Sequence, residues 1–159
     1  MTRSDAPPIV AAVAEVLASE RPRAAGWTTV EVGIGRRPEA ARALVDAGHD
    51  VIAIDVTERD VPTDVTFYRA DVHDLADGTA TLASDVGNGG SGPPSFPVID
   101  AVYARNLPAE IQPATARFAS RVDAPLAFTT LGFESPSPAL PPSIERRAIG
   151  TETVFVLPD

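Results

Sequence analysis

The chain has 159 residues, of which 44% are hydrophobic, and it carries a formal net charge of −9 with no cysteine. This length predicts one domain with a core of its own, and the missing cysteines exclude disulfide bonds and thiolate metal sites. A strongly acidic chain repels phosphate backbones, so we do not expect nonspecific binding to nucleic acids.

The composition predicts a soluble cytoplasmic protein that is adapted to high salt. No apolar run approaches the roughly 20 residues that a membrane helix needs. The stretch Met1–Asp5 lacks the charged-then-apolar order of a signal peptide. All 13 basic residues are Arg, which together with the acidic balance favours a salt-adapted cytoplasm. Codon bias in a GC-rich genome is the alternative explanation.

Helices and strands alternate in the first third of the chain. Apolar residues at helical spacing predict an amphipathic helix over Ile9–Glu20, and β-forming residues predict a strand over Trp27–Val32. A helix rich in Ala begins near Pro38 and ends before Gly48, a residue suited to the position after a helix. The apolar run Val51–Asp55 predicts a strand that is buried on both faces.

The rest of the chain continues this alternation. We predict strands over Val65–Asp71, Val98–Tyr103 and Pro125–Thr130, and a helix that restarts at Pro113 and ends near Val122. We also predict a hairpin over Arg146–Leu157, with its turn near residues 150–151. Gly, Ser, Asn and Pro dominate residues 87–95, which predicts a mobile surface loop.

This pattern predicts one α/β domain over residues 1–159, with a doubly wound, Rossmann-like parallel sheet. Right-handed crossovers between parallel strands give the strand order 3-2-1-4-5, with the C-terminal hairpin on the edge beyond the fifth strand. In such sheets the ligand binds at the carboxyl ends of the first and fourth strands, where the winding reverses.

The candidate binding site follows the first strand. Gly33 and Gly35 allow a ligand to approach the backbone closely, and they precede a helix N-terminus whose free N–H groups can face a ligand. Asp55 ends the next strand, where its carboxylate can accept hydrogen bonds from ribose hydroxyls. The glycine turn and Asp55 together predict a site for a small-molecule cofactor that contains a nucleoside.

Two cofactors compete for this site. A nicotinamide site normally carries the pattern G-x-G-x-x-G, and Pro38 stands at the third glycine position, which disfavours NAD(P). A site for S-adenosylmethionine carries an acid two positions before the first glycine, and often another after the third strand; Glu31 and Asp71 stand at these positions. The alternatives are a strand-end acid bonded to backbone at Glu31 and a turn residue at Asp71. S-adenosylmethionine is the favoured cofactor, and its predicted binding residues are Glu31, Gly33, Gly35, Asp55 and Asp71.

Two blocks of the sequence resemble the archaeal uncharacterised protein family 0146. The first runs from Glu31 through the Ala-rich helix to Asp55, and the second, more discriminating block is Val102–Pro113. The resemblance covers most of the chain outside residues 1–8 and 77–97. It implies a small fold related to that of S-adenosylmethionine-dependent methyltransferases, and it implies no substrate.

Catalytic residues are not evident in the sequence. Methyltransferases that act on base amines often carry Asn/Asp-Pro-Pro-aromatic after the fourth strand, and this chain has Arg105-Asn106-Leu107-Pro108 there, without the aromatic residue. We expect Asn106 to cap the next helix and His73 to be solvated.

Three functions therefore stay open. The first is a methyltransferase that uses S-adenosylmethionine. The second is a regulatory domain that binds NAD(P) or another nucleotide, for which Arg36 and Arg37 could hold a phosphate if they are not simply solvated. The third is a non-catalytic binding protein on a degenerate methyltransferase fold, which the missing aromatic residue favours.

The net charge yields a prediction about salt. If the acidic surface is an adaptation to salt, the fold should lose stability when KCl falls from molar to low millimolar concentration, because like charges then repel without screening. We expect a lower melting temperature at low KCl, measured by circular dichroism at constant pH. Equal melting temperatures under the two conditions would contradict the adaptation.

Overall fold

The computed structural model describes residues 7–20, 26–78, 98–131, 134–149 and 152–158. The predicted loop at residues 87–95 and the predicted turn near residues 150–151 lie outside the described residues. Within the described ranges, no helix is long and apolar enough to cross a membrane.

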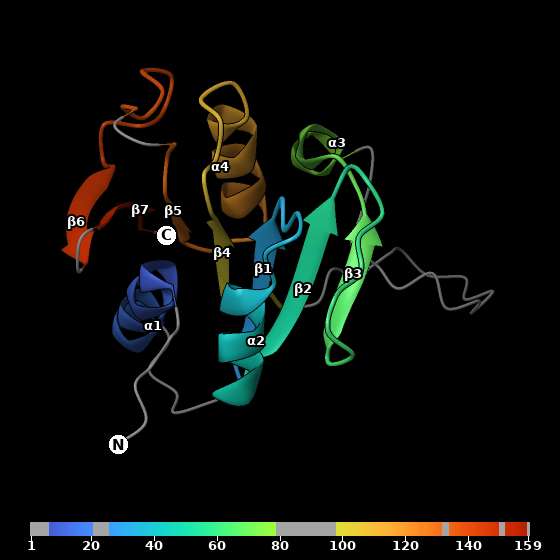
Figure 1. Cartoon of the computed structure of the whole chain (residues 1–159). Coiled ribbons are helices and arrows are strands. Elements are labelled where there is room, and N and C mark those ends of the chain that lie inside the picture. Colours follow the sequence, from blue (N-terminus) through green and yellow to red (C-terminus); the bar gives the residue numbers. More distant parts are fainter. Residues whose placement is uncertain (1–6, 21–25, 79–97, 132–133, 150–151, 159) are drawn as a thin grey trace.

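The described strands form one sheet in the order β3-β2-β1-β4-β5-β7-β6 (Figure 1). The parallel strands are β1 (Thr28–Val32), β2 (Asp50–Asp55), β3 (Val65–Arg69), β4 (Ala101–Ala104) and β5 (Leu126–Phe128). The last two strands, β6 (Glu145–Ile149) and β7 (Glu152–Leu157), are antiparallel to each other, and β7 pairs with β5. The predicted doubly wound order and the hairpin on the edge are confirmed.

Helices cover both faces of this sheet. One face packs against α1 (Pro8–Glu20) and α2 (Glu39–Asp46), and the other packs against α3 (Val72–Asp77) and α4 (Gln112–Arg121). The sheet therefore separates two hydrophobic cores. Successive side chains along a strand point alternately into one core and the other. On β1, Val30 and Val32 enter the core beside α3 and α4, so Glu31 between them faces α1 and α2.

The segment after β4 is fixed by bonds to the end of β5. The Asn106 N–H donates to Thr129 Oγ1 at 2.9 Å, and the Leu107 N–H donates to the Thr129 carbonyl at 2.8 Å. The buried Gln112 side chain adds a bridge, because its Nε2 donates to the Leu107 carbonyl at 2.9 Å and its Oε1 accepts from the Ser137 N–H at 2.7 Å. These bonds give the segment one shape.

The expected cap at Asn106 is wrong. Residue Ile111 occupies the N-cap position of α4, and Pro113 lies in the first turn, where its missing N–H costs nothing. Asn106 instead adopts a φ of 53°, a left-handed conformation that Asn tolerates better than most residues. This backbone reversal turns the chain from the end of β4 toward α4.

Candidate functional site

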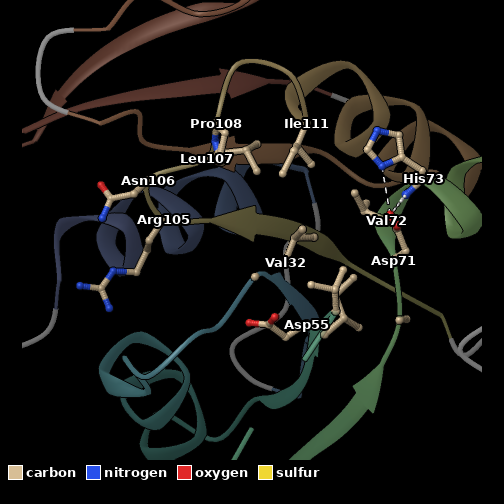
Figure 2. A pocket seen from close by; sticks show the side chains of 14 residues that line it. Val32, Asp55, Asp71, Val72, His73, Arg105, Asn106, Leu107, Pro108 and Ile111 are labelled. Carbon is tan, nitrogen blue, oxygen red and sulfur yellow. Dashed lines mark hydrogen bonds and ion pairs between the residues drawn. The ribbon is translucent and has the colours of Figure 1, made fainter. Parts of the chain in front are cut away.

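A cavity of about 260 Å³ lies at the carboxyl ends of the parallel strands, where the winding of the sheet reverses (Figure 2). Its wall is mostly apolar, with polar side chains at its two ends. The lining residues are Val32, Gly33, Ile54, Asp55, Val56, Ala70, Asp71, Val72, His73, Arg105, Asn106, Leu107, Pro108 and Ile111. In the described part of the chain, no group of three or more His, Asp or Glu residues could hold a metal ion.

The glycines of the turn after β1 are required by backbone conformation. Gly33 has a φ of 71° and Gly35 a φ of 56°, values that other residues rarely adopt. A Cβ atom at either position would meet nothing within 4 Å, so space is not the constraint. The turn is therefore open on its outer side, and Gly33 forms part of the cavity wall.

The amides of this turn are already bonded within the protein. The N–H groups of Gly33 and Ile34 donate to the Ile54 carbonyl at 2.8 and 3.3 Å, and the Gly35 N–H donates to Asp55 Oδ2 at 2.9 Å. These three amides precede α2, and the free N–H groups expected from the sequence are those at the N-terminus of that helix. A phosphate would therefore find none of these three donors available.

Asp55 joins the turn to the end of β2 and also lines the cavity. Its Oδ2 accepts bonds from the Gly35 N–H and from Arg59 Nε at 3.4 Å, and its Oδ1 accepts from the Thr57 N–H at 3.2 Å. A carboxylate offers about four lone-pair sites. These three bonds therefore leave room on Oδ1 for one more donor, such as a ligand hydroxyl.

Asp71 and His73 lie at one end of the cavity (Figure 2). Asp71 caps α3, because its Oδ1 accepts from the His73 N–H at 2.9 Å and lies 3.0 Å from His73 Nδ1. The backbone bond and then the side-chain bond to His73 hold the pKa of Asp71 below its usual range, so Asp71 is ionised at neutral pH. The prediction of a solvated His73 missed this pairing, although the side chain is half exposed.

Glu31 lies behind the cavity rather than in its wall. Its side chain is only 1% exposed, on the face of the sheet that packs against α1 and α2, and Tyr103 Oη donates to its Oε1 at 2.8 Å. Burial raises the pKa of Glu31 from its ordinary value of 4.5 to about 7, and the bond from Tyr103 and the positive charge of Arg105 oppose this rise. Burial and the negative charge of Glu31 place the pKa of Tyr103 well above its ordinary value.

Arg105 lies at the end of the cavity opposite to Asp71 (Figure 2). Its Nη1 donates to Glu39 Oε2 at 3.1 Å, at the start of α2. The backbone bond of Glu39 and then the bond from Arg105 hold the pKa of this carboxyl below its usual range. By contrast, Arg36 and Arg37 are exposed and are not among the residues that line the cavity.

Comparison with known proteins gives the family of the chain. The model of the uncharacterised protein family UPF0146 matches residues 11–76. Two UPF0146 proteins from two strains of Halobacterium salinarum, a halophilic archaeon, are each 37% identical to this chain over 153 residues. These residues are 96% of this chain and 97% of each relative. The chain belongs to the UPF0146 family. Its resemblance to this family in sequence is thereby confirmed.

The solved structures with a similar fold include methyltransferases. Magnesium protoporphyrin IX methyltransferase from Synechocystis PCC 6803, determined with bound SAM (S-adenosylmethionine), is 16% identical with a TM-score of 0.54 and covers 93% of this chain and 76% of its own. The sugar N-methyltransferase KedS8 from Streptoalloteichus is 21% identical with a TM-score of 0.52, and the match covers 96% of this chain and 60% of KedS8. These similarities show the Rossmann-like methyltransferase fold for this UPF0146 protein.

The buried carboxyl of Glu31 yields a prediction about pH. Protonated Glu31 stabilises the fold below pH 4.5, and this contribution is lost as pH rises through its folded pKa of about 7. The shift corresponds to roughly 3 kcal/mol. In Glu31→Gln the side chain stays neutral at every pH. The free energy of unfolding of this variant, relative to that of the natural protein, should therefore increase by up to about 3 kcal/mol when pH is raised from about 5 to about 8.

Urea unfolding at the two pH values measures this gain. Glu152→Gln is the control, because Glu152 is exposed on β7 and is not among the groups that act on Glu31. A stability difference between Glu31→Gln and the natural protein that does not change with pH would contradict a titrating Glu31.

Proposed function

We propose that this UPF0146 protein binds S-adenosylmethionine in the cavity at the ends of β1 to β4 and is a small methyltransferase. The observation that carries the proposal is the bonding around the glycine turn. Three of its amides are bonded to protein oxygens, while Asp55 keeps acceptor capacity beside an apolar wall. Such a site suits a nucleoside without phosphates, and S-adenosylmethionine is one.

The proposed binding roles follow from the walls of the cavity. Asp55 Oδ1 would accept a ribose hydroxyl, and the side chains of Val56 and Val72 would contact the base. Asp71, which is ionised, would accept an N–H from the base. Gly33 and Gly35 would let the ligand lie against the turn. Glu31 is buried behind the turn and does not line the cavity, so its part in cofactor binding stays a prediction.

S-adenosylmethionine supplies a methyl group on a positively charged sulfur. The chain's own contribution would be to hold this group in line with an acceptor, and positioning alone can provide much of the rate of such a transfer. The segment Arg105–Pro108, fixed by its bonds to Thr129, would border the acceptor.

NAD(P) fits the same residues less well. Its pyrophosphate needs donors at the glycine turn, where the amides of Gly33, Ile34 and Gly35 are bonded to the protein. Arg36 and Arg37, which could otherwise hold a phosphate, are exposed outside the cavity wall. These observations favour S-adenosylmethionine.

A non-catalytic binding protein is the second candidate. The segment after β4 has no aromatic side chain to clamp a planar substrate. The backbone of Asn106 is held by Thr129 in a left-handed conformation. A protein that binds the cofactor and transfers no methyl group would show the same ligand affinity and the same fold.

Calorimetry with S-adenosylhomocysteine in molar KCl tests the binding claim. We expect the natural protein to bind, and Asp55→Asn to weaken binding at least about tenfold through a lost charge-assisted hydrogen bond. The matched control is Asp77→Asn, since Asp77 is exposed, pairs with Arg117 and lies outside the cavity. Because Asp55 also holds the glycine turn, Val56→Asp is a second variant. Val56 is 59% exposed, so its replacement leaves the core intact.

A thermal-shift panel decides between the candidate ligands. A ligand present at 100 times its Kd adds about 2.7 kcal/mol of stability. Stabilisation by NAD, NADP or ATP without stabilisation by S-adenosylhomocysteine would contradict the proposal. Equal binding of S-adenosylhomocysteine by the natural protein, Asp55→Asn and Val56→Asp would place the ligand outside this cavity.

A further inference from the structure

Arg105 lines one end of a mostly apolar cavity, and its guanidinium extends from there to Glu39 at the start of α2 (Figure 2). Among the described residues that line the cavity, it is the one Arg side chain, and it is 20% exposed. Its Nη1 is bonded to Glu39, whose side chain is 55% exposed. An Arg carries five N–H donors in a planar arrangement, so this guanidinium can hold Glu39 and a second anion at once.

Glu31 lies behind this positive charge. It is paired in register with Tyr103 on β4, and both side chains face α1 and α2. Arg105 lies just past the end of β4, and its side chain reaches the same side, where it bonds to Glu39 of α2. The charged and titratable groups that act on Glu31 are Tyr103 from β4, Arg105 from the segment after β4, and Glu39 from α2. On the other side, β2 presents the uncharged Ala53 in register with Glu31.

We infer that Arg105 binds the anionic group of the ligand, and that Glu31 takes up a proton when this anion binds. The inference rests on the proposed function, because it assigns the tail of the nucleoside ligand to this end of the cavity. The anionic group is a carboxylate, as in the amino-acid tail of S-adenosylmethionine, or a phosphate.

The layout of the cavity directs the ligand's tail to Arg105. Asp71 and His73 lie at one end, Asp55 lies along the wall, and Arg105 lies at the other end (Figure 2). A nucleoside with its base at Asp71 and its ribose at Asp55 would therefore extend its 5′ substituent toward the guanidinium. Arg–carboxylate and Arg–phosphate pairs are among the strongest hydrogen-bonded pairs in proteins.

Proton uptake follows from the charges. The positive charge of Arg105 favours the ionised form of the buried Glu31 carboxyl. A ligand anion at Arg105 offsets that attraction and adds a like charge close to Glu31. The buried carboxyl then holds its proton more tightly, so binding draws a proton from solution at a pH where Glu31 is largely ionised.

Calorimetry with three probes tests the role of Arg105. S-adenosylhomocysteine carries a carboxylate, 5′-methylthioadenosine carries the same nucleoside without it, and AMP carries a phosphate. At constant ionic strength, we expect Arg105→Gln to weaken the binding of S-adenosylhomocysteine roughly ten- to a hundredfold. The affinity for 5′-methylthioadenosine should change by no more than about twofold. The charge-matched control is Arg147→Gln on β6, where Arg147 pairs with Glu145 and lies outside the cavity.

The direction of proton exchange tests the role of Glu31. The heat of S-adenosylhomocysteine binding is measured near pH 8 in two buffers of different ionisation enthalpy, and we expect net proton uptake by the natural protein. Glu31→Gln should abolish this uptake, since its amide cannot titrate. Net proton release would mean that Glu31 ionises against the ligand's ammonium, and release or no exchange would overturn the inference.

The outcomes separate this inference from the proposed function. Equal affinity of S-adenosylhomocysteine for the natural protein and Arg105→Gln overturns the inference and leaves the binding claim intact. If Arg105→Gln weakens the binding of AMP and not that of S-adenosylhomocysteine, the anion site is supported and its ligand is a phosphate. Failure of all three probes to bind overturns both.

Discussion

The carboxylate of Asp55 accepts the Gly35 N–H at 2.9 Å, and this bond joins the end of β2 to the turn that follows β1. The neighbouring Ile54 carbonyl accepts from the two preceding amides of the turn, those of Gly33 and Ile34. The end of β2 therefore determines the shape of the turn, and this shape requires positive φ at both glycines. The same bonds consume donors that a phosphate would need, so one constraint forms the floor of the cavity and limits its ligands.

Charge on the opposite face of β1 completes the site. Glu31 is a carboxyl between two packed layers, where burial disfavours its ionised form and costs stability at neutral pH. Perturbed carboxyls of this kind concentrate at functional sites, although structural networks also produce them. Here the bond from Tyr103 and then the charge of Arg105 offset part of this cost, and Arg105 also lines one end of the cavity. A ligand anion at this end of the cavity would therefore act on the same guanidinium as Glu31 and Glu39.

The sheet order, the edge hairpin and the positions of Gly33, Asp55 and Asp71 in the wall follow from local patterns in the sequence. Those patterns report which backbone conformation a stretch prefers. They do not report the contacts of Glu31 with Tyr103 and of Arg105 with Glu39, which join residues 72 and 66 positions apart. These contacts depend on the register of non-consecutive strands. The conformation of Asn106 was missed for the same reason, because its N–H bonds to Thr129, a residue that follows β5 and lies 23 positions away.

A crystal structure of the protein with S-adenosylhomocysteine tests the central claim most directly. We expect the ribose hydroxyls at Asp55, the base beside Val56 and Asp71, and the carboxylate at Arg105. We also expect the Gly35 N–H to keep its bond to Asp55 in the complex. A ligand bound outside these walls, or a turn that gives up its bonds to Asp55 and Ile54 to hold the ligand, would contradict the account.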